Sequence, residues 1–340
     1  MDIAHLTLVS GACAAERYGY ARRLSAALGA AYVAVDTPGA GVPEAIYAAA
    51  LAASTGSRDM VLAVPVGVRT DEFIGAVHAP GSPLHLDAAV CVVDAADIAD
   101  ELRDERWVPF PSGEETLDLV AHAALVATQI EFASTIAVVN WEPLPSEGVN
   151  LLLDTLTALA PTASLRLVGE ETPQREPVEH FGPLQERPGW IALLNGEDAH
   201  LGRRDARVGG LRYERAFGFH PGRLALALKA IGEGAHGDVV RSSGFCHLAT
   251  RPGVTARWDH VGQMLTLQPL VVDADTAATG EVLALGQDVA FMGVNLDSEG
   301  LCAELDAALL STEEWLAGPS AWAALEDSFP AWPEARSDAE

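Results

Sequence analysis

The sequence predicts an α/β fold, in which a mostly parallel sheet carries helices on both faces and is followed by a smaller α+β domain. Three observations predict it. Short apolar runs alternate with segments of helical spacing through the first half, which is the pattern of repeated βαβ units. A proline-rich polar stretch then ends this alternation, and short strand-like pieces with few helices follow. The 340 residues also suffice for about two domains, each with its own core.

Six apolar runs of the first half are predicted strands, because each is too short and too continuously apolar to be a helix. They cover residues 5–9, 31–35, 60–65, 88–94, 135–140 and 165–168. A glycine-containing turn and an amphipathic helix up to residue 29 follow the first run, and further helical spacing covers residues 43–54, 70–78, 97–105, 115–132 and 148–160. Strands separated by helices predict parallel pairing, and ligands of such sheets bind at the carboxyl ends of the strands.

The second half predicts a separate domain and a tail. Residues 171–210 are rich in proline and polar side chains, so we interpret them as a linker between a first domain of residues 1–170 and a second of residues 211–312. The second domain has a predicted helix over 221–231, and its residues 288–310 predict strand, turn and helix. Residues 313–340 form an acidic tail, whose Trp315, Trp322 and Trp332 indicate packing on a neighbouring surface or on a partner.

The balance of charges limits what the chain can bind. Forty-eight acidic against 21 basic side chains give a net charge of −27, which argues against direct nucleic-acid binding but allows a basic protein partner. The one concentration of positive charge is a candidate partner surface together with Trp322 and Trp332, although most such clusters are only solvated; it comprises Arg203, Arg204, Arg207, Arg212 and Arg215. Four scattered cysteines and no apolar run of about 18 residues predict a cytoplasmic protein without a membrane span.

The turn after the first predicted strand has the position of a phosphate-binding loop but few of its residues. Such a loop follows G-x-x-x-x-G-K-[ST], in which glycines let backbone N–H groups approach phosphate, the lysine neutralises it and the hydroxyl holds Mg²⁺. Gly11 keeps the first glycine, whereas Glu16, Arg17 and Tyr18 replace the last three positions. The chain's only lysine is Lys229. Arg17 could still hold an anion at a helix N-terminus, but its neighbour Glu16 favours a surface salt bridge.

No residue is predicted to be catalytic or to bind a metal ion. The chain has no G-x-S-x-G elbow, and its cysteines and histidines have no recognisable catalytic setting. Cys246 and His247 are neighbours on a predicted strand and therefore point to opposite faces, which favours buried packing over metal ligation. His78 and His85 are predicted in a solvated loop, and His122 is predicted to be a hydrogen-bonded core or boundary residue of a helix.

Several ordered motifs are shared with one protein family. In the second half they are F-H-P at residues 219–221, V-R-S-S-G-F at 240–245, L-A-T-R-P at 248–252, F-M-G at 291–293 and D-S-F-P-A-W at 327–332. In the first half they are C-V-V-D-A at 91–95, Q-I-E-F-A at 129–133 and P-T-A at 161–163. With these motifs the chain resembles the CobW-type P-loop proteins, metal-trafficking GTPases and their relatives, and most closely their actinobacterial-like members. The resemblance implies a P-loop-NTPase-like first domain and a CobW-C-like second domain.

The resemblance also implies GTP with Mg²⁺ and zinc as ligands, but the motifs that bind them are not retained. Of the family's guanine-reading N-K-x-D motif only Asn140 matches, because Pro143 occupies the aspartate position. The metal-binding C-x-C-C motif has no counterpart, since residues 14–77 contain neither cysteine nor histidine. Asp94 would orient a metal ion or water in an active member, whereas here we favour a cap for the next helix. Residual nucleotide binding is predicted to involve Gly11, Arg17 and Asn140.

We therefore predict a CobW-family pseudo-GTPase that acts through protein contacts in zinc or other metal homeostasis, without nucleotide hydrolysis. Two alternatives stay open. One, implied by the actinobacterial-like relatives, is an accessory factor for ribosome hibernation under zinc limitation; the other is a working GTP-binding metallochaperone with an atypical loop. The predicted partner is a basic protein, either ribosome-associated or metal-dependent. If the chain is an enzyme, the resemblance implies a nucleoside triphosphate hydrolase.

Overall fold

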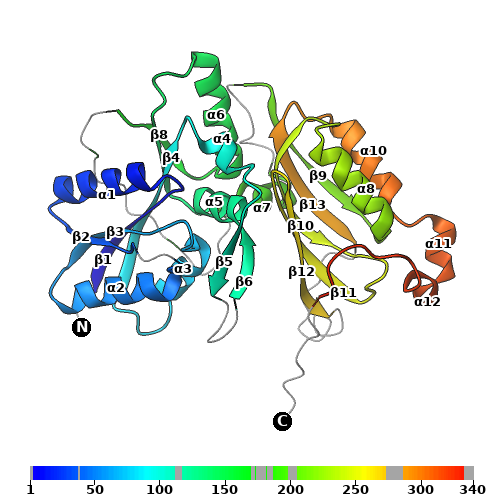
Figure 1. Ribbon diagram of the computed structural model, residues 1–340, viewed down its shortest axis with the longest axis horizontal. Helices are drawn as coiled ribbons and strands as arrows, with labels where there is room; N and C mark the ends of the chain where they lie inside the picture. The colour runs from blue at the N-terminus through cyan, green and yellow to red at the C-terminus, as the bar shows by residue number, and fades with distance from the viewer. Residues whose placement is uncertain are drawn as a thin grey trace, which may run out of the picture. The chain divides into compact units, whose positions relative to one another are not determined.

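The computed structural model describes residues 3–36, 39–111, 117–169, 173, 181, 187–197, 205–272 and 286–332. They form two compact units (Figure 1). Unit 1 comprises Met1–Ala192, Glu197–Val208 and Val261–Met264, and unit 2 comprises Leu193–Gly196, Gly209–His260 and Leu265–Glu340. Among the described residues, no helix has both the length and the apolar character that a bilayer crossing requires.

Unit 1 contains a parallel sheet. Within the described residues, six strands lie in the order β2-β3-β1-β4-β7-β8, and neighbouring strands pair in parallel. Their bounds are β1 Ala4–Ser10, β2 Ala31–Ala34, β3 Asp59–Ala63, β4 Leu84–Asp94, β7 Thr135–Val139 and β8 Ser164–Leu167. All six predicted strands are confirmed, although β4 begins four residues earlier than predicted.

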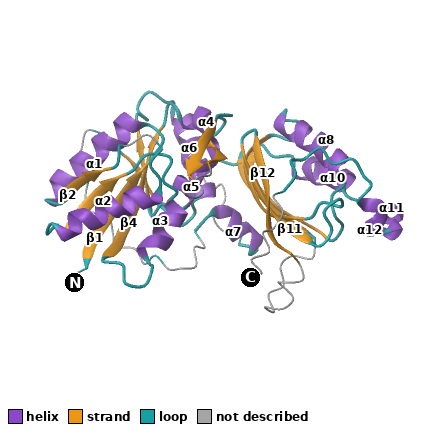
Figure 2. Cartoon of the chain, turned by 60° about the horizontal axis from the view of Figure 1, so that its bottom comes forward, coloured by secondary structure: helices purple, strands orange, loops and turns teal. Residues whose placement is uncertain are grey.

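Helices cover both faces of this sheet (Figure 2). They are α1 Ala14–Leu28, α2 Val42–Ser54, α3 Thr70–Val77, α4 Ile98–Glu101, α5 His122–Glu131 and α6 Ser146–Leu159. Successive residues of a strand point to opposite faces, and β3 shows this directly. Met60 and Leu62 are in a core cluster with residues of α2 and α3, whereas Val61 and Ala63 are in a second cluster with residues of α1. Burial on both faces explains why the strands are continuously apolar.

Two segments differ from the prediction. Residues 115–132 were expected to form one helix, but β6, Leu117–Ala121, pairs antiparallel with β5, Trp107–Pro111, and α5 starts only at His122. A short apolar run next to a helical one has no periodicity of its own, so the pairing with β5 decides its structure. The expected linker also contains a short helix, α7, over Gly189–Leu194.

Unit 2 contains the second sheet and two helices that pack on it. Within the described residues, five strands lie in the order β12-β11-β10-β13-β9, with β10 and β13 antiparallel. The bounds are β9 Val208–Arg215, β10 Asp238–Cys246, β11 Val254–Val261, β12 Met264–Val272, β13 Gln287–Val294, α8 Pro221–Gly232 and α10 Ser298–Ala308. Phe219, Trp258 and Phe291 form the aromatic centre of the core. The predicted helix and the predicted strand, turn and helix are both confirmed.

The acidic tail packs on unit 2 itself. After α11, Thr312–Ala317, and α12, Pro319–Trp322, the chain runs back to β12, where Trp332 Nε1 donates to the carbonyl oxygen of Leu267 at 2.8 Å. The guanidinium of Arg251 lies over the Trp332 ring at 4.2 Å and pairs with Asp327 at 3.0 Å. Trp315 stacks on Trp322 at 4.8 Å between centroids. The tail is therefore part of the fold of unit 2 as far as Trp332.

We expect acid to release this tail before the rest of unit 2 unfolds. Burial alone would raise the pKa of Asp327, but hydrogen bonds from Thr250 and Arg251 hold it below its usual value. Hydrogen bonds from Arg223 lower the pKa of Glu314 to about 2. A carboxylate with a lowered pKa stabilises the docked state fully above its unfolded pKa and loses this effect as pH falls through the folded value. Tryptophan fluorescence between pH 7 and pH 2 should report the release, beginning below about pH 4.5.

The variant Asp327→Asn should weaken tail docking at pH 7 and flatten this acid transition, because the charge that titrates is gone. Glu326→Gln is the matched control, since Glu326 is its exposed neighbour. An acid transition in Asp327→Asn identical to that of the unmodified chain would contradict the assignment.

Candidate functional site

The carboxyl ends of β1, β4 and β7 meet at one edge of the first sheet, where parallel sheets bind their ligands. The turn after β1 lies at the centre of this edge. Because β1 ends at Ser10 and α1 begins at Ala14, only Gly11, Ala12 and Cys13 lie between them. A phosphate-binding loop needs several residues outside the helix so that their N–H groups converge on the anion. The turn here is shorter.

Gly11 is required by its close approach to β4. Its φ is +144°, and a Cβ atom at this position would lie 2.3 Å from the carbonyl oxygen of Val92. Any side chain would therefore push the turn away from β4. The glycine that matches the loop pattern has a packing reason of its own.

Gln129 of α5 fixes the turn from the other side. Its Oε1 accepts the N–H of Gly11 at 2.9 Å, and its Nε2 lies 3.3 Å from the carbonyl oxygens of Pro65, Val66 and Val68. The side chain is 1% exposed. Gln129 thus joins the turn after β1 to the segment after β3. The sequence showed Gln129 only as part of a family motif, so this positioning role was missed.

Arg17 is turned into the protein rather than toward a ligand. Its side chain is 3% exposed, and Nη1 donates to the carbonyl oxygens of Gly11 and, at 3.4 Å, of Ala12. Side chains of a helix point back toward its N-terminus. The side chain of a residue one turn into α1 therefore covers the turn that precedes the helix. The expected surface salt bridge with Glu16 is wrong, because the guanidinium is buried against carbonyl oxygens.

Asp94 and Asn140 bind each other at the ends of β4 and β7. Asn140 Nδ2 donates to Asp94 Oδ2 at 2.6 Å, and the N–H of Ala96 donates to Asp94 Oδ1 at 2.9 Å. Asp94 therefore closes the turn before α4 rather than capping the helix itself, whose N-cap is Asp97. Asn140 has a φ of +55°, a conformation that asparagine tolerates better than most residues.

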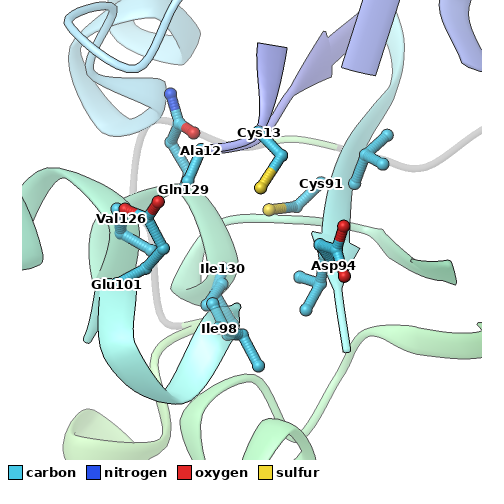
Figure 3. Close-up of a pocket in the computed structure, with 11 residues that line it drawn as sticks. Ala12, Cys13, Cys91, Asp94, Ile98, Glu101, Val126, Gln129 and Ile130 are labelled. Atoms are coloured by element: carbon cyan, nitrogen blue, oxygen red, sulfur yellow. The ribbon is translucent and has the colours of Figure 1, made fainter. Parts of the chain in front are cut away.

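A small cavity opens beside the turn (Figure 3). Its volume of about 10 Å³ is roughly the room that one water molecule needs. Ile98, Val126 and Ile130 form apolar walls, and Cys13 and Asp94 are among the polar groups. Burial, followed by the carboxylates of Asp94, Asp97 and Glu16, raises the pKa of the Cys13 thiol to about 12. The thiol is therefore protonated at neutral pH, and the surrounding potential is negative.

Two groups of potential metal ligands border this edge. Cys13 with Glu16 and Asp94 forms one, and His122 with Glu101 and Asp104 forms the other; the ligand atoms in each lie within 4.8 Å of one another. A protonated thiol is a poor ligand, because metals bind the thiolate. In the second group, the imidazole of His122 pairs with the carboxylate of Glu101, so it is hydrogen-bonded as predicted.

The remaining candidate residues have separate surroundings. Arg203 and Arg204 lie outside the described residues. The other arginines of the basic cluster each pair with a carboxylate: Arg207 with Asp205, Arg212 with Asp288 and Arg215 with Asp306. Trp322 Nε1 donates to the carbonyl oxygen of Glu314 at 2.7 Å. The partner surface stays a prediction.

Two of the predictions about cysteine and histidine are decided by the structure. Cys246 is fully buried, which confirms that it packs in the core. His85 was expected in a loop, and this is wrong, because the earlier start of β4 places it in that strand. His78 is exposed just after α3, with Nδ1 2.8 Å from the carbonyl oxygen of Ile74.

We expect Gln129→Leu to destabilise unit 1 by about 1–3 kcal/mol, because the N–H of Gly11 would be left buried without a partner. Thermal unfolding followed by circular dichroism measures this effect. Thr128→Val is the control: Thr128 lies next to Gln129, and its hydroxyl donates only to Ala124 of the same helix, at 2.8 Å. Equal losses in both variants would contradict the positioning role of Gln129.

Comparisons with known proteins identify a family domain in the second half of the chain and similarity to two proteins named as GTPases. A family model of the cobalamin synthesis protein cobW C-terminal domain matches residues 208–309. Zinc-regulated GTPase metalloprotein activator 1 of Dictyostelium discoideum is 24% identical over 210 residues, which are 58% of this chain and 42% of that protein. The crystal structure of Zn(II)-bound YjiA GTPase from E. coli covers 91% of this chain and 100% of its own, with 11% identity and a TM-score of 0.39.

A Zn(II)-bound triple mutant of YjiA gives 12% identity and a TM-score of 0.40 over the same shares of both chains. The chain spans less than half the length of the Dictyostelium relative. The matched cobW C-terminal domain begins at the first residue of β9 and ends just after α10, so it takes in the second sheet and both of its helices. Residues 208–309 are therefore a CobW C-terminal domain, and the chain is similar to CobW-type proteins.

Proposed function

We propose that this chain is a CobW-family pseudo-GTPase, which acts through protein contacts in zinc or other metal homeostasis and does not hydrolyse nucleotide. The observation that carries the proposal is the position of Arg17. It is the one basic side chain at the loop position where a lysine would neutralise phosphate, and its guanidinium donates to the carbonyl oxygens of its own turn. A triphosphate would have to compete with these buried hydrogen bonds.

The charges around the turn support the same conclusion. Glu16, Asp94 and Asp97 are close enough to Cys13 to raise the pKa of its thiol, so they act together at the place where phosphate oxygens would lie. A magnesium ion would offset part of this charge, but the small hydroxyl that would hold it is replaced by Tyr18. The Tyr18 hydroxyl donates to the carbonyl oxygen of Val35, just after β2, at 2.9 Å. The residues present do not fit a bound Mg²⁺ nucleotide.

The guanine position gives a second, independent argument. Asn140, the remaining residue of the guanine-reading motif, already donates to Asp94. Pro143 stands where an aspartate would accept hydrogen bonds from the base. The residues after β7 thus argue against recognition of the guanine base, and the turn after β1 argues against recognition of the phosphates.

The setting in metal homeostasis is inferred from the family. The Dictyostelium relative is a zinc-regulated GTPase metalloprotein activator by name. The match covers 42% of the Dictyostelium protein. The role of this chain in metal homeostasis is therefore a proposal.

Exposed apolar side chains and the net charge support action through protein contacts. Tyr47 and Leu51 lie one turn apart on α2 and are 69% and 52% exposed, and Leu226 of α8 is 68% exposed. Residues four apart on a helix share one face, so Tyr47 and Leu51 form a continuous apolar stripe. With a net charge of −27, the partner is expected to be basic.

The nucleotide test is a titration of the purified chain with fluorescent GTP and ATP analogues, with and without Mg²⁺. We expect no saturable binding at nucleotide concentrations up to about 1 mM. YjiA GTPase from E. coli serves as the positive control under the same conditions. Saturable binding at micromolar concentrations, displaced by unlabelled GTP, would sink the pseudo-GTPase proposal.

Arg17→Met separates a structural role of this side chain from a role in nucleotide binding. We expect the variant to lower the stability of unit 1 by about 1.5–3 kcal/mol, because hydrogen bonds from a charged donor are lost, and to leave nucleotide binding undetectable. The measurements are thermal unfolding and the same titration. Arg23→Met, at an exposed position of the same helix, is the control. A variant that keeps its stability but changes nucleotide affinity would show that Arg17 serves a ligand.

A further inference from the structure

Three potential metal ligands lie together at the amino-terminal edge of the first sheet, at the other end of β1 from the Gly11 turn. His5 lies near the start of β1, and His85 and Asp87 lie near the start of β4. The two histidines are partners in the parallel register of these strands, so their side chains project from the same face. Gly11 follows six residues later, about 20 Å along an extended strand.

An irregularity in the pairing of the strands brings Asp87 to the histidines. The register between β1 and β4 shifts by one residue after Leu6, which leaves Asp87 as the extra residue of β4. Such bulges re-aim a side chain and occur preferentially near functional sites. As a result, Asp87 Oδ1 lies 2.9 Å from Nδ1 of His5 and 2.9 Å from Nδ1 of His85.

The geometry is close to that of a bound cation. One ligand atom from each of the three side chains lies within 4.8 Å of the other two, and the imidazole centroids are 5.4 Å apart. A tetrahedral zinc ion, with bonds of about 2.0–2.1 Å, holds its ligand atoms about 3.4 Å apart. A shift of about half an ångström in each imidazole would let an ion replace the protons between the rings and the carboxylate.

The exposure of the three groups indicates an open site. Each imidazole side chain is 50% exposed, whereas Asp87 is 15% exposed. Half-exposed imidazoles can bond to water in many orientations, yet both turn the same ring nitrogen to one carboxylate oxygen. Asp59 faces His5 in the register between β1 and β3 and adds negative charge nearby.

We propose that His5, His85 and Asp87 bind one divalent cation of the Zn²⁺ class. Two imidazoles and a carboxylate form a ligand set that suits such an ion, and three protein ligands leave at least one position for water or for a group from a partner. The site differs from the C-x-C-C pattern in chemistry and place, because its ligands come from two neighbouring strands. It is independent of the proposed function, since nucleotide recognition belongs to the opposite edge of the sheet.

The test uses the full chain without an affinity tag, after treatment with EDTA. Isothermal titration with Zn²⁺ should show saturable binding of one ion, and Co²⁺ should give the visible d–d absorption of a low-coordinate site with nitrogen and oxygen ligands. His5→Gln and Asp87→Asn should each weaken Zn²⁺ binding at least about tenfold. The double variant His5→Gln/His85→Gln should abolish it. Zn²⁺ should also raise the thermal midpoint of the unmodified chain and not that of the double variant.

His78→Gln is the matched control, because His78 is also exposed and its Nδ1 bonds to the backbone of its own helix. This variant should bind Zn²⁺ as the unmodified chain does, and circular dichroism should show that every variant is folded. Equal Zn²⁺ affinity in all variants, or no saturable binding by the unmodified chain up to about 100 μM Zn²⁺, would overturn the proposal. Neither result bears on the nucleotide titration, so the two proposals can fail separately.

Discussion

The hydrogen bonds between the Arg17 guanidinium and the carbonyl oxygens of Gly11 and Ala12 set the chemistry of the carboxyl edge of the sheet. They exist because only three residues separate the end of β1 from the start of α1, which places position 17 one turn into the helix. In that position the side chain covers the turn, and its charge is matched by carbonyl dipoles. Breaking these bonds to admit an anion would leave buried carbonyl groups without a donor, which costs free energy.

The same edge concentrates negative charge, because acidic residues gather where the parallel strands end and the helices after them begin. In an active nucleotide site, a lysine contacts the phosphates, and a carboxylate at this edge helps to hold the magnesium ion. In this chain the carboxylates have other partners: Asp94 binds Asn140 and the N–H of Ala96, and Glu101 binds His122. Each of these hydrogen bonds stabilises the local structure. The edge has thus kept its place in the fold, while its polar groups bond mainly to one another.

The sequence predicted the parallel sheet well, because strands buried on both faces leave a clear apolar signal. It failed where the structure of a segment depends on its pairing with another strand. The segment 117–121 is a strand only because β5 pairs with it, and His85 is a strand residue only because β4 pairs with the whole of β1. Arg17 was identified by its position in a motif, but the direction of its side chain follows from where α1 begins. A motif comparison does not contain that information.

The two edges of the first sheet depend on different features of the chain. A phosphate-binding turn depends on loop length, backbone conformation and one lysine, so a few substitutions remove it. A site such as His5, His85 and Asp87 depends on strand register, which the apolar core fixes as long as the sheet folds. The nucleotide binding that the proposed function denies to one edge therefore has no bearing on the metal site proposed at the other. The metal site proposed for His5, His85 and Asp87 depends on the fold of the sheet and not on the chemistry of the Gly11 turn.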